Sequence, residues 1–228
     1  MERLQEMIGN RQCRVYACQH PVALLIQPMG RQELPSIDHE AELITASDRP
    51  FVMAAFAIDD WDKELTPWPD PAISAVPEVG QHAGDTLYYI EHELLPWLHR
   101  RYGELPCVLG GYSLGGLFSL WAATQSTTFA AVVASSPSVW VRDWLTFAEG
   151  HPTHASCVFL SLGDREEHVM DKSIAQVGNN IRQYHQMLAA QLGDERTTLV
   201  WNRGNHFQHG AERTAAGFVW CLGNCPEK

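Results

Sequence analysis

Four glycines surround one serine in the stretch CVLGGYSLGG, residues 107–116. Glycine is costly in regular structure because it loses the most backbone freedom on folding, so this cluster needs a local reason. The segment GYSLG within it has the form G-x-S-x-G, the nucleophile elbow that holds a serine on a strained turn between a strand and a helix. We expect that a Cβ at Gly111 or Gly115 would collide with the neighbouring backbone. Ser113 is therefore the candidate nucleophile.

Two alternatives compete with this interpretation. Isolated G-x-S-x-G matches occur by chance, so the serine could be incidental in a tight glycine-rich turn. A phosphate-binding loop is the other option, but the stretch lacks G-K-[ST] and its glycines do not follow G-x-G-x-x-G. The elbow is favoured because a strand-like run precedes Ser113 and a helical pattern follows it.

A serine hydroxyl needs a base that takes its proton. In proteins with this elbow, the acid and then the histidine follow the serine along the chain. Among eleven histidines, His206 lies in NRGNHF, directly after the strand-like run TTLVWN. His209 follows three residues later, where we expect the final helix to begin. The sequence therefore predicts His206 as the base.

The acid is expected after the strand-like run CVFLSLG, in the stretch GDREE. Three carboxylates compete there. Glu166 is favoured because it has room to turn back toward the histidine, whereas Asp164 is close to the strand end and Glu167 can point outward. The acid would hold the imidazole in one tautomer and stabilise the imidazolium.

Two backbone N–H groups are expected to bind the oxyanion of an acyl-transfer intermediate. One belongs to Leu114, at the start of the helix after the elbow, where the helix dipole favours negative charge. The other should come from the loop after the early strand PVALLI, which reads QPMGR. Its proline has no N–H, so the donor is Met29, Gly30 or Arg31, and we choose Gly30.

The elements that must position these residues alternate along the chain. Strand patterns occupy 21–26, 50–58, 107–112, 129–136, 157–163 and 197–202, and helical patterns occupy 36–47, 85–103, 114–126, 173–192 and 210–222. We expect Ser36 and Asp85 to cap two of the helices, Gly103 to end one, and Pro96 to kink it. This alternation predicts an α/β protein with a mainly parallel, doubly wound sheet.

One segment, residues 59–84, interrupts the alternation with four prolines, two tryptophans and no clear period. Loops of this length in compact domains are usually functional or disordered. We predict that Trp61 and Trp68 form walls of the substrate pocket, with a purely structural packing role as the alternative.

Composition restricts the remaining possibilities. A net charge of −11 disfavours nucleic acid as a partner, because that binding depends on Lys and Arg. No apolar run approaches the ~20 residues that cross a bilayer, and the charged N-terminal stretch lacks a secretory signal. We therefore expect one domain over 1–228, a cytoplasmic location, and free thiols at all six cysteines.

Five stretches resemble one branch of the α/β-hydrolases, the esterase D and enterochelin-esterase-like family: GGYSLGG, DDWDKELTPWP, ASSPSVW, LSLGDREE and GNHF. The resemblance covers about 20–222. It implies an eight-stranded, mostly parallel sheet with helices on both faces, and ester hydrolysis through Ser113, Glu166 and His206. It also implies that Trp140 lines the acyl or alcohol pocket. Relatives commonly carry Asp-Gly where this chain has Met-Gly before Arg31. The resemblance therefore does not decide which residue of this loop donates the second N–H to the oxyanion.

Together these features predict a serine hydrolase that acts on a small ester or thioester, with Tyr112 of the elbow beside the substrate. No metal or organic cofactor is implied. An acyltransferase with the same residues is one alternative, and a non-catalytic binding module on the same fold is another. Neither the natural substrate nor the oligomeric state follows from the sequence.

Overall fold

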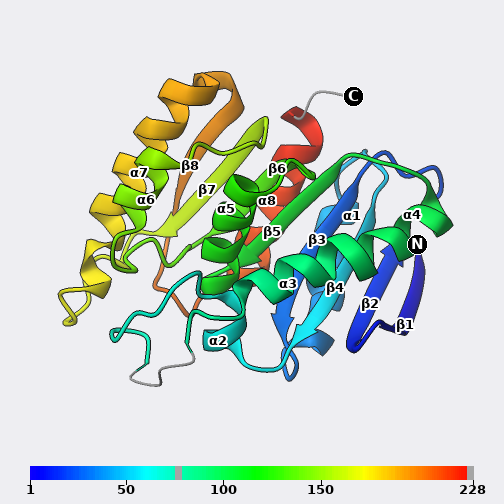
Figure 1. The fold of residues 1–228 in the computed structure, drawn as a ribbon. Coiled ribbons are helices and arrows are strands. Elements are labelled where there is room, and N and C mark those ends of the chain that lie inside the picture. Colours follow the sequence, from blue (N-terminus) through cyan, green and yellow to red (C-terminus); the bar gives the residue numbers. More distant parts are fainter. Residues whose placement is uncertain (75–78, 225–228) are drawn as a thin grey trace.

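The computed structural model describes residues 1–74 and 79–224, and an eight-stranded sheet runs through them in the order β1-β2-β4-β3-β5-β6-β7-β8 (Figure 1). The parallel strands are β3 (Leu24–Gly30), β4 (Val52–Ile58), β5 (Cys107–Tyr112), β6 (Phe129–Ser135), β7 (Cys157–Gly163) and β8 (Thr197–Asn202). Each of the six coincides with or overlaps a predicted strand. The expected α/β-hydrolase arrangement is confirmed.

An antiparallel pair at one edge was not predicted. β1 (Glu2–Ile8) and β2 (Arg11–Ala17) form a hairpin, and β2 pairs in turn with β4. The turn between them contains Gly9, whose φ of +58° suits glycine. β1 is charged and largely exposed because it is the edge strand, so its sequence lacks the apolar run of the buried strands.

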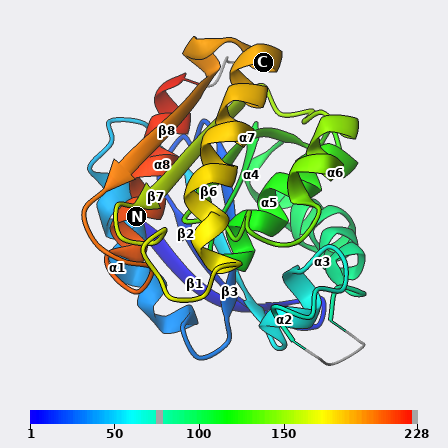
Figure 2. The same cartoon turned by 90° about the vertical axis from the view of Figure 1, so that its left-hand side faces the viewer.

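Helices cover both faces of the sheet, and Figure 2 shows the two layers edge-on. α1 (Ile37–Thr45) and α8 (Gly210–Asn224) lie on one face. The other face carries α3 (Ala83–Tyr89), α4 (Leu95–Tyr102), α5 (Leu114–Gln125), α6 (Trp144–Gly150) and α7 (Val177–Leu192). Successive strand residues alternate between the two layers: Leu25 packs with α1 and α8, whereas Leu24 and Ile26 pack on the opposite side.

Ser36 occupies the predicted N-cap position of α1 without a side-chain capping bond, the predicted cap at Asp85 is wrong, and one helix end is confirmed. The backbone of Ser36 is already helical, because a 3-10 turn over Leu34–Ser36 precedes α1, and its hydroxyl donates to the Glu33 carbonyl instead. α3 begins after His82 rather than at Asp85, whose carboxylate lies 2.7 Å from the His82 ring. Gly103 ends α4 with a φ of +86°, as expected.

Pro96 does not simply bend its helix. A π-helical segment (η2, Ile90–Leu94) joins α3 to α4 directly before the proline, and the three pieces run as one rod in Figure 1. Proline cannot donate a backbone hydrogen bond and clashes with the carbonyl four residues earlier. That carbonyl belongs to His92, inside the widened segment. The chain thus accommodates the proline by a local change of helix type.

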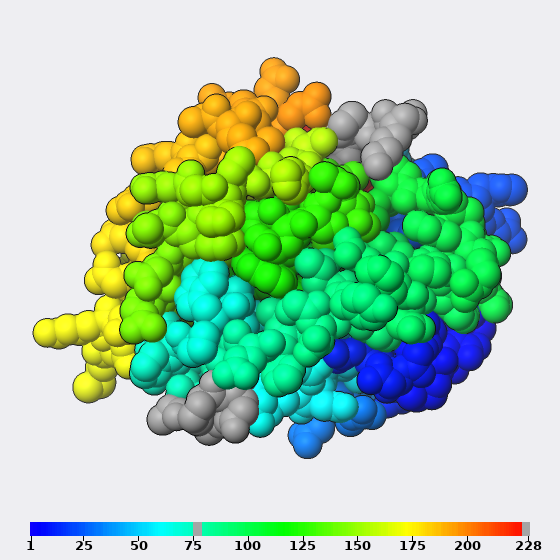
Figure 3. Space-filling view, in the orientation of Figure 1, coloured from blue at the N-terminus to red at the C-terminus, as the bar shows by residue number. Residues whose placement is uncertain are grey.

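The predicted long loop at 59–84 contains regular structure. α2 (Trp61–Leu65) begins three residues after β4, inside this segment, and is capped by the Asp60 carboxylate, which accepts the N–H of Lys63. Residues 75–78 lie outside the described part, and α3 begins at Ala83. α6 was also not predicted. The segment between β7 and α7 projects from the left edge of the molecule in Figure 3.

Two further expectations concern the whole chain. Cys13, Cys18 and Cys221 are free thiols, as predicted, and Cys225 lies outside the described residues. Within 1–74 and 79–224, no helix combines the length and the apolar character that a membrane crossing requires.

Candidate active site

Ser113 occupies the sharp turn between β5 and α5. Its φ of +58° and ψ of −122° are unusual for a residue with a side chain, and such strain is typical of functional positions. A Cβ at Gly111 would lie 2.5 Å from the carbonyl carbon of Gly115, so the predicted requirement for glycine at 111 is confirmed. The same expectation for Gly115 is wrong: a Cβ there would meet the Trp61 ring at 3.4 Å, close to an ordinary contact.

The loops after β7 and β8 bring an acid and a histidine to this serine. His206 Nε2 lies 3.0 Å from Ser113 Oγ, and His206 Nδ1 lies 2.7 Å from Glu166 Oε2. The two other acid candidates are engaged elsewhere. Asp164 accepts the N–H of Gly204, and Glu167 forms a two-point pair with Arg182.

The Glu166 carboxylate is buried, with only 4% of its side chain exposed. Its Oε1 accepts hydrogen bonds from Gly163 N–H at 2.8 Å, Ser136 Oγ–H at 2.7 Å and Arg213 Nη1 at 2.7 Å. Burial acts to raise the pKa of Glu166, but the hydrogen bonds from His206, Ser136 and Gly163 outweigh it, so the pKa lies below its ordinary value. The group is therefore a carboxylate at neutral pH.

Tyr112, predicted to contact substrate, has a second role in the structure. It lines the cleft at Ser113, and its hydroxyl donates a 2.7 Å hydrogen bond to the backbone carbonyl of His206. Burial raises the pKa of Tyr112, which keeps the phenol protonated and able to donate. The residue before the nucleophile thus fixes the loop of the histidine.

The two backbone groups predicted as oxyanion donors lie on different elements. Leu114 is the first residue of α5, where N–H groups have no partner within the helix. On β3, the N–H of Leu24 donates toward the start of β5 and that of Arg31 donates to β4. Because N–H directions alternate along a parallel strand, the N–H of Gly30 faces the β5 side. It lies beyond the last β3–β5 pair, at Ile26.

A cleft of about 570 Å³ opens beside Ser113. Apolar side chains form much of its wall, and the described residues that do so include Met29, Ile58, Trp61, Tyr112 and Phe207. Phe207 is 93% exposed although it directly follows the histidine. Arg31 pairs with Asp59 at the same cleft.

Two tryptophans predicted at the substrate do not line this cleft. The Trp68 indole stacks beside Trp144, contacts Phe147 at a ring distance of 5.0 Å and donates to the Arg142 carbonyl. Trp140 lines a separate hollow near α6. Both belong to the α6 region: the segment after α2 carries Trp68 to that helix, and Trp140 lies in the chain just before it.

Three polar residues near the serine were not found from the sequence. Ser138 Oγ lies 3.4 Å from Ser113 Oγ. Ser136 and Arg213 both contact the carboxylate of Glu166. A signal existed for the arginine, because it falls on the apolar face of the predicted helix 210–222, where a charged residue is out of place.

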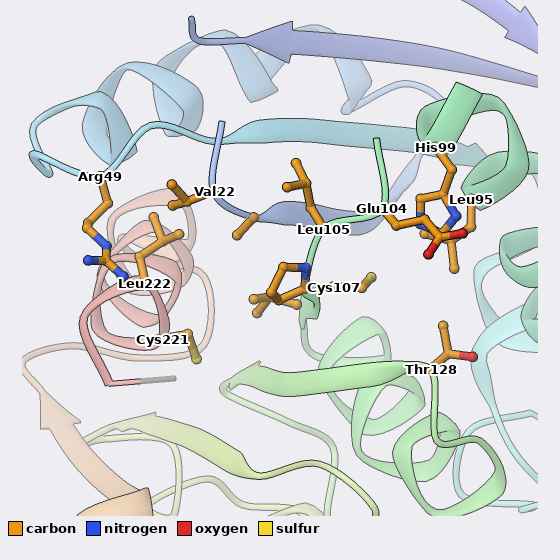
Figure 4. Close-up of a pocket in the computed structure, with 13 residues that line it drawn as sticks. Val22, Arg49, Leu95, His99, Glu104, Leu105, Cys107, Thr128, Cys221 and Leu222 are labelled. Atoms are coloured by element: carbon orange, nitrogen blue, oxygen red, sulfur yellow. The ribbon is translucent and has the colours of Figure 1, made fainter. Parts of the chain in front are cut away.

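Another cavity, of about 660 Å³, lies at the opposite end of the strands (Figure 4). Apolar residues such as Val22, Leu105 and Leu222 line it. Cys107 also lines it and is the first residue of β5, whereas Ser113 follows the last. The length of the strand therefore separates this cavity from the serine.

A family model described as Putative esterase matches residues 50–209, a range that contains the serine, the acid and the histidine. No curated protein is similar enough in sequence to be matched.

Solved structures of similar fold include an IroE-like serine hydrolase from Shewanella oneidensis. It is 16% identical at a TM-score of 0.78, with 97% of this chain and 80% of that one covered. The siderophore hydrolase EstA from Aspergillus nidulans is 18% identical at a TM-score of 0.71, with coverage of 97% and 94%. The enterobactin esterase FES from Shigella flexneri is 18% identical at a TM-score of 0.61, with coverage of 97% and 58%. At these identities the likenesses show the shared fold.

Proposed function

This chain belongs to the Putative esterase family, and we propose on that premise that it hydrolyses a small carboxylic ester or thioester through an acyl-enzyme on Ser113. The observation that carries the proposal is the continuous line from Ser113 Oγ through His206 to the Glu166 carboxylate, with steps of 3.0 Å and 2.7 Å. This is the arrangement that activates a serine hydroxyl.

In the first half-reaction, Ser113 Oγ attacks the carbonyl carbon of the ester while His206 Nε2 takes the hydroxyl proton. The tetrahedral intermediate then expels the alcohol or thiol, which receives that proton from His206. In the second half-reaction, water attacks the acyl-enzyme, and His206 takes a proton from the water and returns it to Ser113. Glu166 stays ionised throughout and stabilises the imidazolium.

The N–H groups of Leu114 and Gly30 are proposed to bind the oxyanion. Leu114 is the first residue of α5, and Gly30 ends β3, beyond the last pair that β3 makes with β5. Loss of one such donor costs roughly 100- to 1,000-fold in rate.

The cleft suits a small substrate with an apolar part. Its volume of about 570 Å³ lies within the range of small-molecule sites. Trp61 and Phe207 offer aromatic surface to an acyl or alcohol group. Because two of the similar structures are a siderophore hydrolase and an enterobactin esterase, an iron-siderophore ester belongs in the substrate panel beside simple aryl and alkyl esters.

The test is labelling with a fluorophosphonate probe, together with hydrolysis of p-nitrophenyl esters. Wild type should react with the probe and Ser113→Ala should not. Ser138→Ala is the matched control, since its hydroxyl lies only 3.4 Å from that of Ser113, and this variant should still be labelled. Labelling of Ser113→Ala, or no labelling of wild type, would exclude Ser113 as the nucleophile.

An acyltransferase would use the same three side chains and would differ in passing the acyl group to an alcohol instead of water. Adding alcohol acceptors to the ester assay and measuring transfer against hydrolysis separates the two reactions. Hydrolysis should dominate, because the cleft is open and the histidine side chain is 33% exposed to solvent.

A further inference from the structure

Arg213 is a charged residue buried inside the molecule, with 1% of its side chain exposed. It lies in the first turn of α8, a helix that otherwise packs small and apolar residues against the sheet. Removing a guanidinium from water is costly unless it is paired and hydrogen-bonded. Its position therefore calls for an explanation in terms of its partners.

Those partners come from the last residue of β5, from the residue directly after β6, and from the loops after β7 and β8. Nη1 donates to Glu166 Oε1 at 2.7 Å, to Ser136 Oγ at 2.9 Å and to the Tyr112 hydroxyl at 3.3 Å. Nη2 donates to backbone carbonyls of the loop that carries the histidine, at Asn205 and Arg203. The Arg213 side chain thus contacts Glu166, the Tyr112 hydroxyl that donates to the His206 carbonyl, and the backbone of the loop that carries His206.

We propose that Arg213 is the positioning residue of this site: it holds the acid loop and the histidine loop at the spacing that aligns His206 with Ser113. The inference rests on the proposed function, since it assigns a role within that triad. A planar guanidinium is suited to it because its fixed fork of donors can span separate acceptors, whereas the ammonium of lysine is a single point.

A second arginine pair on the same acid loop provides a comparison. Arg182 binds Glu167 with two bonds of 2.8 Å, but 44% of its side chain is exposed and its partner is one residue away from the triad acid. Exposed pairs of this kind contribute little to stability. Both pairs join an arginine to a carboxylate of the acid loop at 2.7–2.8 Å, but Arg182 binds with two nitrogens, is exposed and has no contact with the histidine loop among the bonds above, which makes it the control.

The charge of Arg213 should also affect the pH dependence. The ionisable groups around the carboxylate are His206 from the loop after β8, Tyr112 from β5, and Arg213 from α8, while Asp164 binds the Gly204 N–H nearby. A positive charge on the far side of Glu166 disfavours protonation of the carboxylate that orients His206. Without it, the carboxylate binds a proton at higher pH, and the acidic limb of kcat/KM moves upward.

The experiment measures kcat, KM and the pH profile of p-nitrophenyl ester hydrolysis for wild type, Arg213→Met, Arg213→Lys and Arg182→Met. For Arg213→Met we expect kcat to fall about 100-fold, the effect of a misplacement of roughly 1 Å, with KM nearly unchanged. Its acidic limb should shift to higher pH. Arg213→Lys should keep the acidic limb of wild type and lose less kcat. Arg182→Met should match wild type.

A folded Arg213→Met enzyme with the kcat and acidic limb of wild type would overturn the proposal. A second result would also overturn it: Arg213→Met loses kcat, the acidic limb of its kcat/KM profile stays where it is in wild type, and Arg213→Lys recovers none of the lost kcat. A purely structural role predicts that result. If Arg213→Met does not fold, Arg213→Lys decides: kcat equal to wild type refutes the positioning role. Probe labelling of wild type reports separately on the proposed function.

Discussion

The change from Glu166 to glutamine tests the triad with the smallest alteration in shape. The carboxylate accepts hydrogen bonds at both oxygens: Oε2 from His206, and Oε1 from Gly163, Ser136 and Arg213. Glutamine replaces one oxygen with an NH₂ group, which donates and cannot accept. The amide must therefore turn its nitrogen toward the histidine or toward the other three partners.

The environment decides which orientation is favoured. The Ser136 hydroxyl can rotate, but the N–H of Gly163 and the Nη1–H of Arg213 are fixed donors. A buried donor left without an acceptor costs about 1–3 kcal/mol, so turning the amide nitrogen toward these two costs ~2–6 kcal/mol. The amide oxygen should stay on their side, and its nitrogen should donate to His206 Nδ1. That bond places the imidazole proton on Nε2, where it prevents acceptance of the serine proton.

Reversing this orientation during catalysis lowers kcat by about 30- to 30,000-fold on these energies, a range that includes the ~10,000-fold loss seen when a triad acid becomes its amide. The assay is kcat for p-nitrophenyl acetate, with the rate of fluorophosphonate labelling as a second readout. Glu167→Gln is the control, because that carboxylate pairs with the exposed Arg182. A Glu166→Gln enzyme within about tenfold of wild type would refute the assigned orientation.

Three further predictions follow from packing and burial. Gly111→Ala should destabilise the protein by at least ~1–3 kcal/mol in urea unfolding, because the new Cβ would lie 2.5 Å from a backbone carbon, whereas Gly84→Ala, with nothing within 4 Å, should not. Trp68→Ala should leave kcat/KM unchanged across esters of different acyl length, and Trp61→Ala should lower it, since only Trp61 lines the cleft; equal effects would contradict this assignment. Burial raises the pKa of Glu40 from 4.5 to about 8, so the folded state binds the proton more tightly and wild type loses stability as pH rises through that window. Glu40→Gln should remove ~3–4 kcal/mol of this loss, measured as the difference in unfolding free energy between pH 5 and pH 8.

The buried parallel strands could be predicted because each contains an apolar run, and β8, a half-exposed edge strand, because its sequence is rich in Thr, Val and Trp. β7 and β8 match the predicted ranges, and the elbow follows β5 as the glycine pattern requires. The hairpin of β1 and β2 could not be found from hydrophobicity, since exposure on the edge strand removes the apolar run. A Gly9-Asn10 pair between the two strands is a hairpin signal that was available.

The roles of the two tryptophans after β4 could not be separated by sequence. Trp61 and Trp68 lie seven residues apart in one proline-rich segment, and either could face the serine. The structure separates them because α2 begins at Trp61 and holds it beside Gly115, after which the chain runs toward α6. Which side chain reaches the cleft depends on packing between elements distant in sequence.

The sheet order explains why the histidine loop needs external support. β5 and β8 are separated by β6 and β7, so three interstrand steps of about 4.8 Å place the two strand ends roughly 14 Å apart. The acid follows the strand next to β8, but His206 must reach back across the sheet to Ser113. A loop that bridges such a distance keeps one geometry only if its backbone is fixed at several points. Tyr112 and Arg213 supply those points, at the carbonyls of residues 203, 205 and 206. The position of the nucleophile is therefore a local property of the elbow, whereas its activation depends on residues far apart in the sequence.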